Sequence, residues 1–361
     1  MTSIIKIKSV FTERDKTEML PELSDGFSVS QCLSIFNRRF HPVLLAGAGA
    51  LLLTGCEAPL NLQAVEQERA KSVHRTDQLQ SLASTATALI AVGSNGLVLR
   101  SETKAQPDWQ RQQLTGEPSF IEVVSCPDNS FAALAMDRTL WRSSDDGISW
   151  QLNTLPTQEN VLSLACAPDN SLWVTGSFST ILSSRDQGQS WQETSLNEDA
   201  MLTSIQFLDA DHAIVAGEFG MISRTADGGD SWQLAEPIPD DFYPQGSYFK
   251  DADHGWVAGL NGAVLYTRDG GRNWQRQATG TESPLYSFQP VGDALYLLGD
   301  HGTVLKLAGE RWQRLQTPTI PVYLRAAASV GEQQLLVAGG WGALFTVNTE
   351  ATIAVADNTT E

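Results

Sequence analysis

Four aspartates recur at one fixed position of a short motif, and they are the first residues whose spacing could do chemistry. They lie in the pattern [S/T]-x-D-x-G-x-x-W and are Asp145, Asp186, Asp227 and Asp269. Repeated carboxylates invite comparison with the acid and base of a glycoside hydrolase. However, the motif also has what a tight turn needs, because carboxylate and hydroxyl oxygens accept backbone N–H groups and glycine takes positive φ. We therefore expect these four aspartates to be structural.

A second group of acids offers the main enzymatic alternative. The candidate paired carboxylates of a glycoside hydrolase are Asp240, Asp241, Glu282 and Glu117. A sialidase would also need an arginine triad, a tyrosine nucleophile and an early Arg-Ile-Pro segment, but Ile320 and Pro321 follow a threonine. Acids on an acidic surface are usually only solvated. The sequence thus favours a protein that is not an enzyme.

Metal and cofactor sites have no matching pattern in the sequence. The five histidines are not spaced as zinc ligands, and the acidic turns lack the further glutamate of an EF-hand. Glycine pairs at residues 228–229 and 270–271 are expected to be turn glycines and not phosphate loops. We expect no metal and no cofactor.

Cys56 follows a segment with the anatomy of a bacterial lipoprotein signal. Arg38 and Arg39 precede an apolar run over residues 43–53, which is too short to span a bilayer but suits a signal peptide. Residues 53–56 (LTGC) then resemble a lipobox, in which small residues precede the cysteine that receives the lipid. We expect residues 1–55 to be an N-terminal extension with a signal peptide, and Cys56 to be lipidated. An ordinary signal peptide or a buried apolar strand is the alternative.

The residues after Cys56 bear on the location of the mature protein. Residues 56–77 are polar, have no strand pattern and are expected to form a tether. Glu57 stands in place of the aspartate that favours inner-membrane retention in many bacteria. The prediction is a periplasm-facing lipoprotein of the cell envelope, with the outer membrane favoured.

An internal repeat defines the elements that must position these side chains. A motif related to G-x-x-G-x-[LIV]-x-x-[S/T] begins at residues 93, 135, 176, 217, 259, 299 and 339. Each unit is about 41 residues long and parses as four short strands, A to D, which in the third unit are residues 162–165, 171–175, 180–183 and 191–194. A four-stranded antiparallel sheet repeated at this period is a propeller blade. We expect an all-β, seven-bladed β-propeller of four-stranded antiparallel blades over residues 78–361.

Closure of the ring is left open by the sequence. The seventh unit has a plausible outer strand of its own at residues 352–356, so blades one and seven could simply abut. Alternatively, a stretch before residue 78 completes the seventh blade.

One face of such a propeller carries side chains that no turn requires. The D–A and B–C loops share this face, and the aspartate motifs lie on the opposite one. Five consecutive D–A loops bring acids, whereas the B–C loops bring Phe178, Phe219, Asn261, His301 and Trp341. Aromatic anchors within a polar rim are typical of protein-binding surfaces, although such tips can instead fold back as core. The candidate binding residues are Phe178, Phe219, Asp240, Asp241, Phe242, Tyr243, His301, Tyr323 and Trp341.

Two cysteines occupy matching positions at the ends of adjacent A strands. Cys126 and Cys166 could form a disulfide in an oxidising compartment if their Cα atoms lie within about 7 Å. Neighbouring A strands diverge, so two buried free thiols are the alternative.

The aspartate motifs resemble the Asp boxes of BNR (sialidase-type) repeats. The fifth unit, AGLNGAVLYTRDGGRNW at residues 258–274, resembles more specifically the photosystem II stability/assembly-factor family, as does the preceding segment at residues 253–259. The resemblance covers units two to six well and units one and seven loosely. It implies a seven-bladed propeller without known catalysis that binds membrane-protein subunits and helps them assemble.

Relatives in non-photosynthetic bacteria extend what the resemblance implies. Many are secreted or lipid-anchored, and some are encoded beside transporters of the resistance-nodulation-division (RND) type. The expected function is therefore an assembly or accessory factor that binds a membrane or periplasmic protein complex, an RND-type transporter among the candidates. An Asp-box glycoside hydrolase and a propeller that binds a small ligand or lipid at its channel mouth remain the alternatives.

The net charge narrows the classes of partner. The chain carries −18 at pH 7, and the part after residue 55 has 18 basic and 37 acidic residues, a balance of −19. A surface this acidic repels phosphate backbones, so we expect no nucleic-acid partner.

Overall fold

A computed structural model describes residues 62–102 and 105–352. The predicted signal peptide, the predicted lipidation site Cys56 and residues 353–356 of the predicted last strand lie outside these residues. The described residues from Gln63 onward belong to one compact unit, which contains the propeller. No helix among the described residues is long and apolar enough to cross a membrane.

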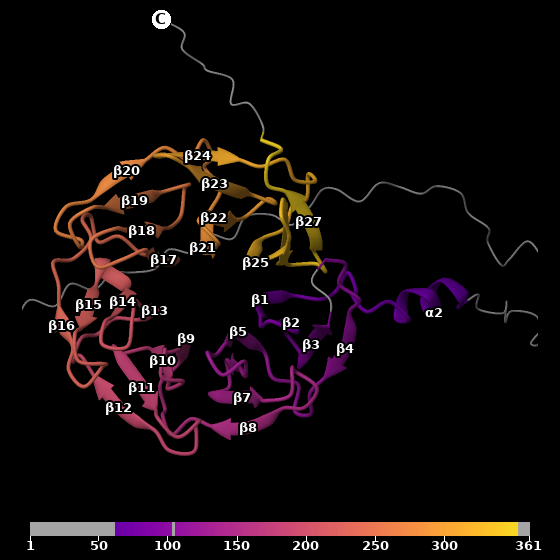
Figure 1. Cartoon of the computed structure of the whole chain (residues 1–361), viewed down its shortest axis with the longest axis horizontal. Helices are drawn as coiled ribbons and strands as arrows, with labels where there is room; N and C mark the ends of the chain where they lie inside the picture. Colours follow the sequence, from indigo (N-terminus) through magenta and orange to yellow (C-terminus); the bar gives the residue numbers. More distant parts are fainter. Residues whose placement is uncertain (1–61, 103–104, 353–361) are drawn as a thin grey trace, which may run out of the picture. The chain divides into compact units, whose positions relative to one another are not determined.

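Seven antiparallel sheets are arranged around a common axis, in the order of the sequence (Figure 1). Their strands are β1 (Leu79–Ser84), β2 (Leu89–Gly93), β3 (Leu97–Ser101), β4 (Gln110–Gln113); β5 (Phe120–Ser125), β6 (Phe131–Ala135), β7 (Thr139–Ser143), β8 (Gln151–Thr154); β9 (Val161–Cys166), β10 (Leu172–Gly176), β11 (Thr180–Ser184), β12 (Gln192–Ser195); β13 (Leu202–Phe207), β14 (Ala213–Gly217), β15 (Ile222–Thr225), β16 (Gln233–Leu234); β17 (Gly246–Phe249), β18 (Gly255–Ala258), β19 (Val264–Thr267), β20 (Gln275–Gln277); β21 (Leu285–Val291), β22 (Ala294–Gly299), β23 (Val304–Ala308), β24 (Arg311–Arg314); and β25 (Leu324–Gly331), β26 (Gln334–Gly339), β27 (Leu344–Asn348).

The sheets confirm the predicted seven-bladed propeller. Six blades have four strands, and the strands of the third blade match the predicted ranges to within one residue at each end. The second strand of each blade is largely apolar and buried, as in β14 (AIVAG), because a neighbouring blade covers each of its two faces. The outermost strands, such as β12 (QETS), are polar because they face solvent.

The hydrophobic core lies between blades and not within them. Each buried cluster joins two neighbouring blades; one, for example, combines Trp173 of blade three with Val215 of blade four. The tryptophan that follows each Asp box packs into the cluster shared with the preceding blade, as Trp232 does beside Trp173, with ring centroids 6.2 Å apart. The Asp box thus brings its tryptophan to an interface between blades.

Apposition of blades one and seven closes the ring, which was one of the two alternatives. A buried cluster joins Leu79 and Leu99 of blade one to Ala326 and Leu336 of blade seven. Blade seven has three strands within the described residues. Thr352, where the predicted outer strand begins, makes an isolated antiparallel bridge to Leu315 at the edge of blade six.

The segment before β1 also takes part in closure, although the sequence assigned it to the tether. A short helix, α2 (Gln63–Arg69), precedes it. The Asp77 carbonyl accepts the Gly342 N–H at 2.7 Å, so this segment covers the B–C turn of blade seven. The Asp77 side chain, 6 % exposed, holds both amino groups of Arg111 on β4 at 2.7 and 3.0 Å. Because those hydrogen bonds need the folded ring, residues near 77 belong with the propeller.

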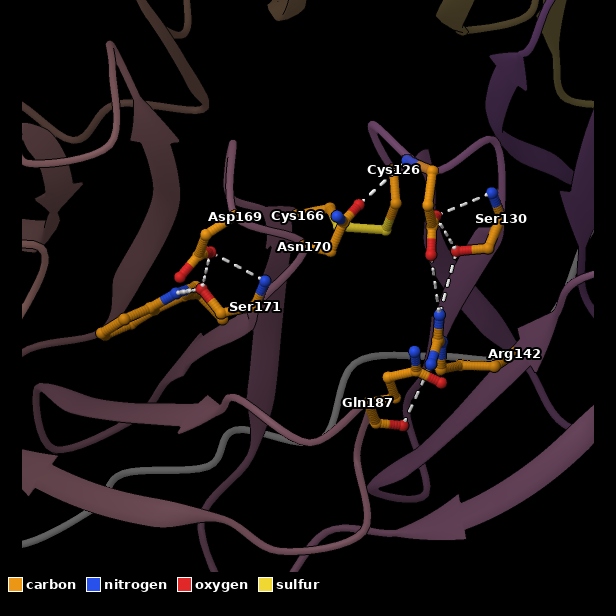
Figure 2. Close-up of a disulfide and its surroundings, with 10 residues drawn as sticks. Cys126, Ser130, Arg142, Cys166, Asp169, Asn170, Ser171 and Gln187 are labelled. Atoms are coloured by element: carbon orange, nitrogen blue, oxygen red, sulfur yellow. Dashed lines mark hydrogen bonds and ion pairs between the residues drawn. A yellow bond between two sulfur atoms is a disulfide. The ribbon is translucent and has the colours of Figure 1, made fainter.

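Cys126 and Cys166 form a disulfide that joins β5 and β9, with their Cα atoms 5.3 Å apart (Figure 2). The innermost strands of blades two and three therefore approach closely enough at this end for a disulfide to form. Beside the disulfide, the Asp128 N–H donates to the Asn170 side-chain oxygen at 2.9 Å, a second link between the two blades.

Candidate functional site on the B–C face

The Asp boxes occupy the turns between the third and fourth strands, and their geometry is that of a turn. Asp186 Oδ1 accepts the Ser184 hydroxyl at 2.8 Å and the Ser190 N–H at 2.8 Å. The Ser184 hydroxyl oxygen in turn accepts the Gly188 N–H at 2.7 Å. Equivalent bonds hold Asp145, Asp227 and Asp269.

These hydrogen bonds favour the ionised carboxylate. Donation from the Ser190 side chain and backbone and from Ser184 lowers the pKa of Asp186 to about 2. Ser231, through side chain and backbone, and Thr225 lower the pKa of Asp227 to about 2 as well. A carboxylate held in this way is a poor proton donor at neutral pH, so the geometry agrees with a structural role.

The four Asp boxes also link their own blades to the preceding ones. The guanidinium of Arg224 on β15 donates to the Gly270 carbonyl, in the Asp box of the next blade, at 3.0 Å. Likewise, Arg100 on β3 donates to the Asp146 carbonyl at 2.7 Å. The box therefore has a structural use beyond its own hairpin.

The opposite face is built from B–C turns, each covered by the D–A loop that follows its blade. The Gly220 N–H of a B–C turn donates to the Phe242 carbonyl at 2.8 Å, and the Gly262 N–H donates to the Ser283 carbonyl at 3.1 Å. Because the same bond recurs around the ring, these two sets of loops share one surface, which we call the B–C face.

Aromatic side chains stand at the tips of three B–C turns. Phe178, Phe219 and Trp341 have positive φ of 50°, 57° and 54° and are 56 %, 61 % and 67 % exposed. Asparagine and glycine favour such turn positions, and a bulky ring is uncommon there. The rings do not fold back as core, which was the alternative. Bulky residues in a disfavoured conformation and directed into solvent make this surface a candidate for contact with a partner.

The predicted acids lie on the same face. Asp240 and Asp241 are exposed, with φ of 62° and 49°, in the loop that covers the blade-four turn. Glu159 accepts the Ser177 hydroxyl at 2.7 Å, directly beside Phe178. Acidic groups therefore flank Phe178 and Phe219. The remaining D–A acids Glu117, Glu198, Asp199 and Glu282 are exposed as well.

Other candidate residues of this face differ in their degree of burial. Tyr243 and His301 are exposed. Phe242 is half-buried against the core between blades four and five. The Tyr323 hydroxyl accepts the Gln80 side-chain N–H at 2.8 Å across the closure between blades seven and one. Phe242 and Tyr323 thus have packing roles that the sequence did not indicate.

Two apolar residues of the B–C face were missed from the sequence. Met136 and Leu260 are 68 % and 55 % exposed at the B–C turns of blades two and five. Their position in the repeat could have indicated them, because each stands directly before the turn tip, where the other units have serine, glutamate, aspartate or glycine. A search for aromatic residues alone could not find them.

The central channel forms a polar cavity of about 900 Å³, lined by the first strands of the blades. Glu122 lies in it, accepting the Leu164 N–H at 2.7 Å and the Ser163 hydroxyl at 3.1 Å. Burial raises the pKa of Glu122, partly offset by these bonds and by Arg325. Among the described residues, no group of three or more His, Cys, Asp or Glu side chains could hold a metal ion.

The fold and the turns together define a seven-bladed propeller of the Asp-box type. A family model described as photosynthesis system II assembly factor YCF48 matches residues 142–241 and 238–358. The chain belongs to this family, because the match extends over more than half of its length. A comparison with curated proteins finds no match.

Solved structures share the fold at low sequence identity. YCF48 bound to a D1 peptide superposes with a TM-score of 0.62 and 14 % identity, over 76 % of this chain and 93 % of that one. YCF48 from Cyanidioschyzon merolae gives 0.60 and 16 %, over 76 % and 96 %. Virginiamycin B lyase from Staphylococcus aureus gives 0.60 and 11 %, over 77 % and 97 %. Propellers with different functions therefore share this architecture, so the fold alone does not define the function.

Proposed function

We propose that this chain is a non-catalytic lipoprotein of the cell envelope whose B–C face binds a membrane or periplasmic protein complex, as an assembly or accessory factor. The observation that carries the proposal is the set of exposed rings of Phe178, Phe219 and Trp341 at positive-φ turn tips. Family membership supports it, since the family model is that of an assembly factor and one solved member is bound to a peptide.

The location of the protein is part of the same proposal. The lipobox-like segment ending at Cys56 supports attachment to a membrane, with the outer membrane favoured by Glu57. A disulfide between Cys126 and Cys166 suits an oxidising compartment such as the periplasm. An RND-type transporter is the first partner to test.

The proposal that the chain is not an enzyme rests on where its carboxylates lie. Asp240 and Asp241 are exposed on one loop, whereas a hydrolase places its two carboxylates on opposite sides of the bond that it cleaves. Burial raises the pKa of Glu122, but Glu122 lies in the channel beside Arg325 and not among the loop acids.

Site-specific photocrosslinking in intact cells tests the proposal. A photoreactive amino acid replaces Phe219 in the full chain, and crosslinked proteins are identified by mass spectrometry. Ile148 provides a matched control, because it is 60 % exposed against 61 % for Phe219 but lies in an Asp box on the opposite face. We expect a membrane or periplasmic protein crosslinked from position 219 and not from position 148.

Three results would overturn this proposal. The first is that position 219 crosslinks no protein in cells. The second is the same set of crosslinked proteins from both positions, which would indicate unspecific proximity. The third is turnover of glycan substrates by the purified chain that Asp240→Asn or Asp241→Asn abolishes, which would establish the hydrolase instead.

A further inference from the structure

Exposed apolar side chains are concentrated on the B–C face. Among the described residues, eleven large apolar side chains are exposed. Six of them lie on this face, and four of the six stand at the B–C turns of four consecutive blades, two to five. We call these four the apolar arc: Met136, Phe178, Phe219 and Leu260.

The two phenylalanines of the arc have a costly backbone conformation, which argues against chance. Phe178 and Ser179 are consecutive residues at φ of 50° and 48°, and neither is glycine. Asn261 holds the position equivalent to Phe219 in the next blade, at φ 55°, so asparagine fits this turn. Because a non-glycine residue, and a bulky ring above all, is disfavoured in the left-handed region, the propeller retains phenylalanine where a more favourable residue is available.

Acidic groups are held directly beside the arc. The Glu198 N–H donates to the Ser179 hydroxyl at 3.0 Å, which places Glu198 next to the Phe178 turn. Glu218 precedes Phe219, and its carboxylate accepts the Met201 N–H at 2.8 Å. Asp137 follows Met136, and Glu282 lies in the loop that covers the Leu260 turn.

Basic groups are nearly absent from the same surface. Arg138 is the one lysine or arginine in the described B–C turns and D–A loops that flank the arc. Its guanidinium donates to the Gln158 carbonyl at 3.0 Å. The arc is therefore an apolar strip within an acidic surface.

We infer that the apolar arc binds a polypeptide segment in which apolar side chains alternate with lysine or arginine. Apolar residues of such a segment would cover Phe178 and Phe219, and its bases would pair with the acids between the tips. This inference rests on the proposed function. It adds which kinds of side chain the bound segment carries and which blades bind that segment. An anionic membrane surface does not fit, because the acids beside the arc repel it.

Designed peptides test the inference on the purified full chain. The probe is a fluorescent peptide of leucine and lysine, compared with leucine/glutamate and serine/lysine peptides of equal length, and binding is followed by anisotropy. We expect binding of the leucine/lysine peptide alone, weakened about tenfold or more by Phe178→Asn or Phe219→Asn. Ile148→Asn, the matched exposed apolar control, should bind like the wild type.

Charge is tested separately from apolar contact. Asp240→Asn with Asp241→Asn should weaken leucine/lysine binding and reduce its dependence on salt, since fewer ion pairs are screened. Equal binding of the leucine/glutamate peptide, or unchanged affinity in both phenylalanine variants, would overturn the inference. Competition by neutral lipid vesicles would overturn it too, because the arc would then be a lipid-binding surface.

Failure of the inference can be told apart from failure of the proposed function. If position 219 crosslinks a partner through an acidic or uncharged segment, the proposed function holds. The inference that the bound segment carries basic and apolar side chains is then wrong. If the leucine/lysine peptide binds at the arc but position 219 crosslinks nothing in cells, the inferred binding preference of the arc holds and the proposed function is wrong.

Discussion

Gly229, in the Asp box of blade four, lies against the indole of Trp173 in blade three. A Cβ atom on Gly229 would come within 2.1 Å of Trp173 Cη2. The glycine of this box therefore has two duties: it takes φ of 89° to close its hairpin, and it leaves room for the neighbouring blade. Asp boxes in this protein are interfaces between blades as much as turns.

Gly229→Ala should destabilise the propeller by about 1–3 kcal/mol, because the new methyl group must displace a buried ring. Thermal unfolding followed by circular dichroism measures the effect. Gly228→Ala is the matched control: it also has positive φ, at 68°, but its nearest contact would be the Ala210 carbonyl at 3.2 Å. Equal losses in the two variants would mean that φ alone, and not the contact with Trp173, decides the cost.

Phe219→Asn should stabilise the fold, by up to about 1 kcal/mol, since asparagine tolerates the left-handed conformation better than phenylalanine does. Urea unfolding gives the change. The reverse substitution in the next blade, Asn261→Phe, should lower stability. A loss of stability in Phe219→Asn would show that the ring is needed for folding, and its exposed position would then need another explanation.

The disulfide should raise the free energy of unfolding by about 2–4 kcal/mol, since it closes a loop between residues separated by 40 positions. Replacing Cys126 and Cys166 together by serine removes it. Unfolding of the wild type and the double variant should differ under oxidising conditions and coincide in excess reductant. A difference that persists in reductant would be due to packing of the sulfur atoms.

Stability should fall as the solution becomes strongly acidic, because the pKa of Asp186 and of Asp227 is lowered to about 2 by folding. Their contribution is present above the unfolded value of about 3.9 and is lost as pH falls through about 2. The urea midpoint measured between about pH 5 and pH 2 should decrease less in Asp186→Asn than in the wild type. A parallel decrease in both proteins would assign the acid sensitivity to other carboxylates.

Arg111→Ala should weaken closure of the ring, because it leaves the carboxylate of Asp77, only 6 % exposed, without its cation. A cost of about 1–3 kcal/mol is expected for an uncompensated buried polar group. Limited proteolysis after residue 69 should become faster in this variant, since residues 72–77 are held by the same bonds. An unchanged cleavage rate would place the anchor of this segment elsewhere.

The sequence by itself determined the architecture, because one turn motif recurs in all seven blades and the Asp box in four of them. Turn glycines, the Asp-box hydrogen bonds and the alternation of apolar and polar strands are decided within about 41 residues, so the number of blades and their strands could be read directly. The assignment of Asp145, Asp186, Asp227 and Asp269 to turns followed from the same local rules.

Only the tertiary structure decided which side chains remain exposed. Phe242 and Phe219 are both aromatic loop residues, yet one packs between blades and the other stands in solvent. Met136 and Leu260 are ordinary in sequence and join the apolar arc only because neighbouring turns share one face. The disulfide and the closure at Asp77 likewise depend on distances between blades. Contacts between residues far apart in the chain are set by the closed ring, and no local pattern encodes them.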